Sequence, residues 1–157
     1  MELKVRTKDK YVIHGTIDMP KKKTDTCIVF IHGLMGYMNE SKFLGAKEYF
    51  TKKGIATARF SLYTTKEDSR KLGKSTVATH VSDSESVIKE VSKHFKKIYV
   101  VGHSLGGPVA CLVNKKNVRA IILWDPTLRQ ASSLDKKLKY IKQLDSYIIS
   151  WGYDFLM

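Results

Sequence analysis

One serine in this sequence has the neighbours that a nucleophile needs. Ser104 lies midway between Gly102 and Gly106 in the segment Gly-His-Ser-Leu-Gly, a Gly-x-Ser-x-Gly pattern. β-branched and aromatic residues, 98–101, come before it, and an apolar stretch with helical spacing follows. A serine on a sharp strand-to-helix turn requires neighbours nearly free of side chains, and its hydroxyl then stands at a helix N-terminus that favours negative charge. The alternative is a glycine-rich turn that merely contains a serine.

A second glycine-rich turn follows an earlier apolar run. Residues 26–31 are almost continuously apolar, which is typical of a strand buried on both faces, and they lead into His-Gly-Leu-Met-Gly at 32–36. With both turns, the sequence resembles the α/β-hydrolase superfamily, in which Gly-His-Ser-Leu-Gly-Gly is a common nucleophile elbow. The resemblance implies that Ser104 is the nucleophile and that the backbone N–H groups of Leu34 and Leu105 form the oxyanion hole. A plain strand-to-helix turn is the other interpretation of residues 32–36.

The sequence departs from the superfamily in its histidines. A serine hydroxyl attacks well only when a base takes its proton, and the base is normally a histidine held by a carboxylate. In the superfamily the chain order is serine, then acid, then histidine. Here no histidine follows Ser104, so we expect this chain to be weakly active or inactive. The five histidines, all upstream of the serine, are His14, His32, His80, His94 and His103.

Each upstream histidine has a more ordinary role than catalysis. We expect His103 to pack away from the serine, and His32 to hydrogen-bond its own loop. His80 lies in the first turns of a helix that follows a polar loop, which makes it the remaining stand-in for the base. His14 and His94 are expected at the surface.

Asp125 is the candidate acid. It ends the apolar run 118–124, a position from which some lipase-like members of the superfamily supply their acid, whereas the usual acid lies one strand later. The dipeptide Asp125-Pro126 is equally typical of a turn that ends a strand.

The elements expected around these residues alternate between strands and helices. Residues 2–6 and 11–19 predict an antiparallel hairpin. Helical spacing covers 40–53 and 75–95, with a strand at 55–62 between them. This order predicts an α/β fold, in which a mostly parallel sheet has helices on both faces and the N-terminal hairpin at its edge.

The C-terminal part resembles an incomplete domain. We interpret residues 1–157 as the N-terminal portion of a single α/β-hydrolase domain, without the final strands that would carry the usual acid and the histidine. A helix is predicted over 134–144, and 147–157 is an apolar segment that ends on Phe-Leu-Met. The strand at 118–124 would then form an exposed apolar edge, able to pair with a second polypeptide.

Composition excludes several other classes of protein. The net charge is +13, but the lysines are scattered at element ends, so we do not expect nucleic acid as a partner. No apolar run approaches the roughly 20 residues that span a bilayer, and the N-terminus lacks a signal-peptide core, which predicts a cytoplasmic protein. Cys27 and Cys111 look like small buried residues, and we expect no metal and no cofactor.

Two functions are consistent with these features. The first is a serine hydrolase that acts on an ester or related acyl bond of a small molecule through an acyl-enzyme. The alternative is a non-catalytic protein of the same fold that binds a ligand or a partner chain.

Overall fold

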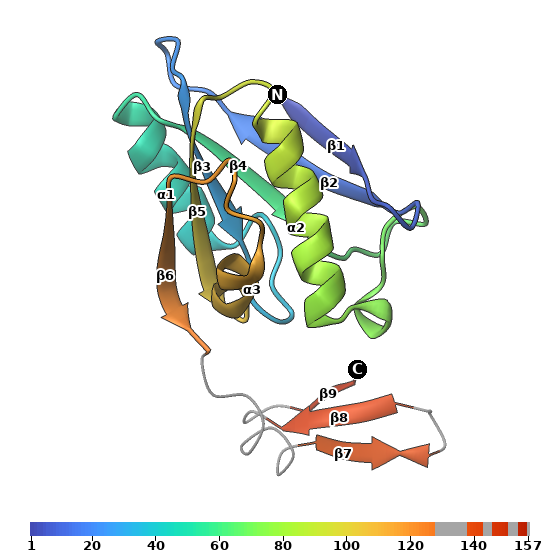
Figure 1. The fold of residues 1–157 in the computed structure, drawn as a ribbon. Helices are drawn as coiled ribbons and strands as arrows, with labels where there is room; N and C mark the ends of the chain where they lie inside the picture. Colours follow the sequence, from blue (N-terminus) through green and yellow to red (C-terminus); the bar gives the residue numbers. More distant parts are fainter. Residues whose placement is uncertain (128–137, 143–145, 151–153, 157) are drawn as a thin grey trace. The chain divides into compact units, whose positions relative to one another are not determined.

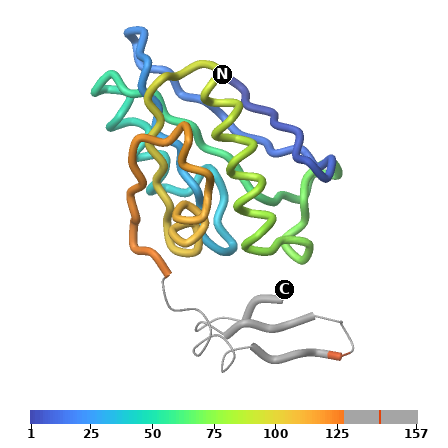
Figure 2. Tube along the Cα trace, viewed as in Figure 1, coloured from blue at the N-terminus to red at the C-terminus, as the bar shows by residue number. Residues whose placement is uncertain are grey.

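The computed structural model describes residues 1–127, 138–142, 146–150 and 154–156 of the chain (Figure 1 and Figure 2). The chain divides into two compact units, Met1–Pro126 and Thr127–Met157. Every residue with a predicted site role lies in the first unit. The expectation that the whole chain forms one domain stays a prediction.

A six-stranded sheet organises the first unit, in the order β1-β2-β4-β3-β5-β6. The hairpin of β1 (Glu2–Arg6) and β2 (Val12–Asp18) lies at one edge, and β2 runs antiparallel to β4. The other four strands are parallel to their neighbours: β4 (Ala56–Ser61), β3 (Thr26–Ile31), β5 (Lys97–Ser104) and β6 (Ala120–Pro126).

Burial along the strands follows their place in the sheet. All six residues of β4 are buried, and so are five of the six in β3, because these strands are central in the sheet and helices cover both of its faces. At the opposite edge from the hairpin, β6 exposes Ile122, Leu123 and Trp124. The expected exposed apolar edge strand is therefore confirmed within the described residues.

Helices cover the sheet on both faces, as predicted (Figure 1). One core cluster joins α2 (Val77–Val91) and α3 (Gly106–Leu112) to one face of the sheet, and a smaller cluster joins α1 (Ser41–Lys52) to the other. A single turn of 3₁₀ helix, η1 (Leu72–Lys74), precedes α2. None of the helices in the described part of the chain is both long enough and apolar enough to cross a membrane.

The second unit contains three antiparallel strands: β7 (Leu138–Ile141), β8 (Ser146–Ser150) and β9 (Asp154–Leu156). The predicted helix over 134–144 is therefore wrong for residues 138–141. Tyrosine and isoleucine favour strands, and pairing with β8 overrides the helical spacing of the lysines. The rest of that predicted helix, apart from Lys142, lies outside the described residues.

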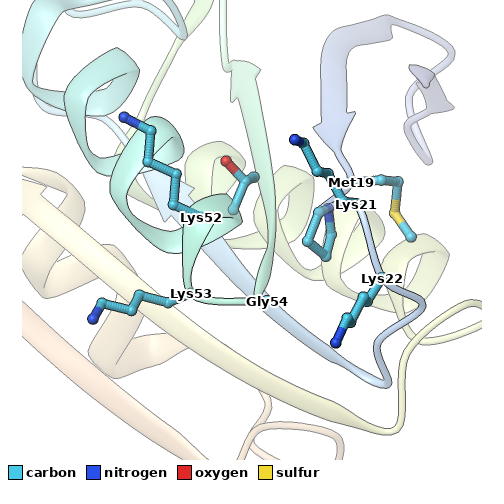
Figure 3. A pocket seen from close by; sticks show the side chains of 8 residues that line it. Met19, Lys21, Lys22, Lys52, Lys53 and Gly54 are labelled. Atoms are coloured by element: carbon cyan, nitrogen blue, oxygen red, sulfur yellow. The ribbon is translucent and has the colours of Figure 1, made fainter.

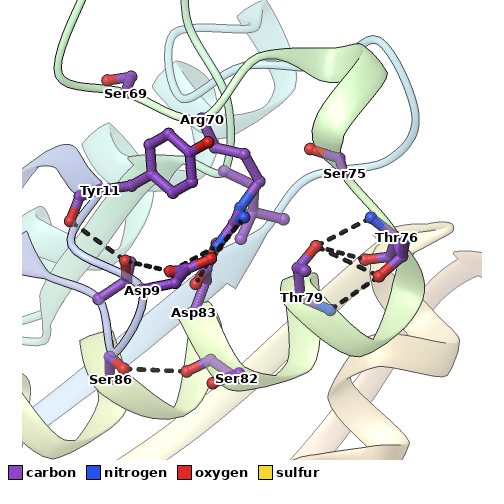
Figure 4. Close-up of polar contacts among 12 residues, drawn as sticks. Asp9, Tyr11, Ser69, Arg70, Ser75, Thr76, Thr79, Ser82, Asp83 and Ser86 are labelled. Carbon is purple, nitrogen blue, oxygen red and sulfur yellow. Dashed lines mark hydrogen bonds and ion pairs between the residues drawn. The ribbon is translucent and has the colours of Figure 1, made fainter.

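A buried arginine fixes the loop between β4 and α2 (Figure 4). The Arg70 guanidinium donates to both carboxylate oxygens of Asp83 on α2, over 3.0 and 3.1 Å, and to Asp9 in the β1–β2 turn over 3.0 Å. It also lies 4.6 Å from the ring centre of Tyr11. Burial alone would lower the pKa of Arg70, but the hydrogen bonds that it donates to Asp83 and Asp9 hold the pKa above its ordinary value.

We expect the substitution Arg70→Met to lower the free energy of unfolding by about 3–5 kcal/mol, because it leaves the Asp83 carboxylate buried without its partner. Lys93→Met is the matched control, since it breaks an exposed pair with Glu90 and should cost less than about 0.5 kcal/mol. Urea unfolding of both variants measures the difference. Equal losses would contradict a structural role for the buried pair.

Candidate active site

The chain passes from strand to helix within two residues at Ser104. Strand β5 ends at Ser104, which has a φ of 51°, and Leu105 already has right-handed helical angles. A positive φ is unfavourable for a serine, so its surroundings must hold it there. We call residues 102–107 the serine turn.

Glycines make the serine turn sterically possible. A Cβ atom at Gly102 would lie 2.2 Å from the carbonyl oxygen of Gly106, and one at Gly106 would lie 2.3 Å from that of Ile31. A Cβ at Gly107 would lie 2.6 Å from the Cβ of Pro126. The turn therefore packs by its backbone against the ends of β3 and β6, where no side chain would fit.

The His-Gly turn, residues 32–36, lies directly against the serine turn (Figure 2). Strands β3 and β5 pair in parallel up to Ile31 and Gly102, so both turns leave the same edge of the sheet. A Cβ at Gly33 would lie 2.8 Å from the Cβ of Ser104 and 3.2 Å from its Oγ. The fold thus brings together the two turns that contain Ser104, Leu105 and Leu34.

His32 is committed to the His-Gly turn, as predicted. Its Nε2 accepts a hydrogen bond from the backbone N–H of Leu62 over 2.9 Å, so the ring proton is on Nδ1, which donates to the Gly33 carbonyl over 2.7 Å. Burial lowers the pKa of His32. A neutral ring with both nitrogens engaged cannot also serve Ser104 as a base.

His103 is a packing residue, also as predicted. Its ring meets the ring of Phe43 edge-on at 6.3 Å and that of Trp124 at 6.1 Å between centroids. Burial and the charge of Lys42 lower the pKa of His103.

Asp125 occupies a β-bulge beside the serine turn. The pairing of β5 with β6 runs from His103 opposite Trp124 to Ser104 opposite Pro126, which leaves Asp125 as the extra residue. Its φ is 47°, and its side chain is exposed. Bulges re-aim side chains at sheet edges, so Asp125 leaves β6 next to Ser104 with an orientation that regular pairing would not give.

His80 stacks on Tyr63, which contacts the His-Gly turn. It is 97% buried on α2, and its ring stacks on that of Tyr63 with centroids 5.7 Å apart. Tyr63 in turn contacts the ring of His32 and donates to the Gly33 carbonyl. Tyr63 therefore lies in contact with both His80 and His32. The use of His80 as a base stays a prediction.

Tyr63 contacts the His-Gly turn, but the sequence analysis did not identify it as a site residue. It begins a polar stretch without periodicity, and its one available signal is an aromatic side chain directly after a buried strand. Its importance comes from contacts with the His-Gly turn thirty positions earlier, which no local pattern encodes.

Two predicted burial assignments are wrong. His14 was expected at the surface, but it is 91% buried and its Nε2 lies 2.9 Å from Asp68, because the loop after β4 folds over β2. Cys111 was expected inside, but it is exposed, because α3 turns Val109 and Ala110 toward the core. Cys27 is buried as expected, and His94 is exposed.

A lysine-lined pocket of about 570 Å³ lies at the other end of the sheet (Figure 3). Lys21 and Lys22 follow β2, while Lys52 and Lys53 end α1, so these lysines lie at element ends as predicted. Gly54, also in the lining, precedes β4 at the edge away from the serine turn. In the described part of the chain, no three His, Cys, Asp or Glu side chains are grouped to hold a metal ion.

A family model described as "Alpha/beta hydrolase family" matches residues 28–156. A comparison with curated proteins found no match. Solved structures with the same fold include Est1E from Butyrivibrio proteoclasticus with bound ferulic acid, at 23% identity and a TM-score of 0.72 over 79% of this chain and 52% of that chain. The Pyrococcus furiosus esterase Pf2001 has 21% identity and a TM-score of 0.71, over 87% and 52%.

A putative hydrolase from Agrobacterium vitis S4 has 15% identity and a TM-score of 0.75, over 100% of this chain and 67% of that chain. The chain spans about half the length of the two esterases. At these identities the likeness shows the fold, and it confirms the predicted α/β-hydrolase architecture.

Alanine substitutions at a crowded glycine of the serine turn and at an open glycine of α1 should change the free energy of unfolding in opposite directions. Gly102→Ala should lower the free energy of unfolding by about 1–3 kcal/mol, because its Cβ overlaps the Gly106 carbonyl. Gly45→Ala is the control: it lies within α1 with no atom within 4 Å of the new Cβ, and should raise stability by about 0.5–1 kcal/mol. Urea unfolding distinguishes the two, and changes of the same sign would contradict the packing described.

The burial of His80 predicts a loss of stability in acid. Burial lowers the pKa of His80 from 6.5 to about 4, so the unfolded chain binds a proton first as the pH falls. The contribution of His80 is complete above about pH 6.5 and should decline by up to about 3 kcal/mol as the pH falls toward 4. His80→Phe, which keeps a ring against Tyr63, should remove this part of the decline.

Urea unfolding at a series of pH values measures the effect. His94→Phe is the matched control at an exposed position and should leave the decline unchanged. Identical pH dependence in the original chain and in His80→Phe would show that His80 is not its source.

Proposed function

The chain belongs to the alpha/beta hydrolase family, and from that premise we propose that it carries the nucleophile and oxyanion side of a serine esterase site. Ser104 is the nucleophile, and the N–H groups of Leu34 and Leu105 form the oxyanion hole. The observation that carries the proposal is the contact of Gly33 with Ser104, at a serine held with a φ of 51°. The esterases among the similar structures support a small-molecule ester as the substrate class.

The reaction would proceed through an acyl-enzyme. The Oγ of Ser104 attacks the carbonyl carbon of the ester while its proton passes to a base, and the carbonyl oxygen becomes an oxyanion. The two backbone N–H groups stabilise that charge, and collapse of the intermediate expels the alcohol, which takes up the proton. Water then attacks the acyl-enzyme in the same way and releases the acid.

The base is the component of the site that this proposal leaves unassigned. No histidine follows Ser104 in the sequence, His32 has both ring nitrogens hydrogen-bonded, and His103 is packed between two aromatic rings. Without a base, an oxyanion hole and substrate binding still give residual catalysis over water. We therefore propose that this chain is weakly active by itself.

Asp125 is the proposed acid. Its carboxylate leaves the sheet from the bulge opposite Ser104, at the edge where a histidine approaching the serine would have to be oriented. The positive φ of Asp125 belongs to the bulge and is equally consistent with a turn that ends β6, so the proposed role rests on the position of Asp125 beside Ser104.

A non-catalytic binding protein is the second candidate. It is supported by the exposed apolar residues of β6, whose outer edge offers a second polypeptide a strand to pair with. A cytoplasmic location and the lack of a nucleic-acid partner stay predictions of the sequence.

Labelling with a fluorophosphonate, followed by mass spectrometry, tests the esterase proposal. We expect a slow adduct on Ser104, which is lost in Ser104→Ala and retained in the control Ser86→Ala on α2. Because the chain lacks a histidine after the nucleophile, added imidazole should accelerate the labelling by supplying the base.

The opposite result is equally informative. A folded, monodisperse chain whose Ser104 stays unlabelled with and without imidazole would contradict the esterase proposal and favour the binding protein.

A further inference from the structure

The carbonyl oxygen of Gly33 accepts three hydrogen bonds. The donors are the Nδ1–H of His32 over 2.7 Å, the backbone N–H of Gly36 over 3.1 Å and the hydroxyl of Tyr63 over 3.3 Å. Two of these donors belong to the His-Gly turn itself. The third comes from the loop after β4, so Tyr63 is the external support of this carbonyl.

The direction of this carbonyl determines the direction of the Leu34 N–H. Both groups belong to the planar peptide between Gly33 and Leu34, which is trans, so the N–H points opposite to the C=O. Three donors hold the carbonyl toward the side of His32 and Tyr63. The N–H consequently points in the opposite direction within the same peptide plane, away from His32 and Tyr63.

We propose that Tyr63 is a positioning residue for the oxyanion hole: its hydroxyl holds the Gly33 carbonyl so that the Leu34 N–H is directed at the oxyanion formed on attack by Ser104. This inference rests on the proposed function. In this role Tyr63 acts through the peptide that it orients.

Tyr63 is itself held in place from several sides. Its ring stacks on His80, with an interplanar angle of 30°, and meets the ring of His32 edge-on at 5.2 Å. The loop that carries it is tied down by the backbone bond from Thr64 to the Arg70 carbonyl, and Arg70 is anchored in its buried ion pair.

The chemistry of the hydroxyl suits a permanent donor. Burial raises the pKa of Tyr63 to about 12, although backbone hydrogen bonds from Met35 and Gly36 act in the opposite direction. The phenol therefore keeps its proton at every pH at which an esterase would work.

A single NMR signal can report on this peptide. The dipeptide Gly-Leu occurs once in the sequence, at residues 33–34, so a chain labelled with carbonyl-¹³C glycine and ¹⁵N leucine gives one carbonyl–amide cross-peak. Tyr63→Phe keeps the ring but removes the hydroxyl. We expect the Gly33 carbonyl carbon to move upfield on losing a donor, and the Leu34 amide to move with it. Tyr99→Phe, on β5, is the control and should leave the cross-peak in place.

The rate of fluorophosphonate labelling of Ser104, with imidazole present, gives the functional readout. We expect Tyr63→Phe to slow labelling about tenfold, less than the loss of a whole oxyanion donor, because the Leu34 N–H remains but is less well aimed. Tyr99→Phe should label at the original rate. Urea unfolding of both variants checks that they are folded.

The outcomes separate this inference from the function on which it rests. An unmoved cross-peak in folded Tyr63→Phe overturns the inference, whatever the labelling rate. A moved cross-peak with an unchanged labelling rate shows that Tyr63 shapes the turn without serving the oxyanion hole, and also overturns it. If the original chain is not labelled at all, the proposed function fails first, while the cross-peak still decides whether Tyr63 holds the Gly33 carbonyl.

Discussion

The candidate site depends on the close approach of two backbone turns, which only glycine permits. Beyond the ends of β3 and β5, a Cβ at Gly106 would lie 2.3 Å from the carbonyl oxygen of Ile31, and a Cβ at Gly33 would lie 2.8 Å from that of Ser104. Backbone contact here replaces the side-chain packing that fills the rest of the interior. The same contact holds Ser104 at a positive φ, which a serine in a looser setting would leave.

Features encoded by local pattern could be predicted from the sequence. The strand at 26–31 shows its burial in its composition, because a strand covered on both faces has no polar side to alternate with. The spacing of Gly102 and Gly106 predicts a sharp turn at Ser104, because these two positions must lack side chains. Both turns and the order of the elements around them were accessible for this reason, and resemblance to a known superfamily supplied their meeting at one edge.

Features that depend on contacts between distant segments could not be predicted in this way. His14 and Asp68 are 54 positions apart, and nothing in the loose alternation of β2 indicates that a loop will cover it. Tyr63 and Arg70 likewise lie in a stretch without periodicity, although one contacts the His-Gly turn and the other anchors the loop. The helix predicted over residues 138–141 was wrong for a related reason. The local sequence is compatible with both a helix and a strand, and pairing with β8 selects the strand.

The two sides of a serine hydrolase site differ in what they require of a fold. Oxyanion donors are backbone groups, so they are in place as soon as β3 and β5 end side by side and the glycines let their turns meet. A base is a side chain that must be brought to the serine. The nearby histidines of the described chain are used for shape instead: His32 closes its own turn, and His103 packs between aromatic rings. On our proposal, then, residues 1–126 build the electrostatic side of the site, and the base for Ser104 is the component that the proposal leaves unassigned.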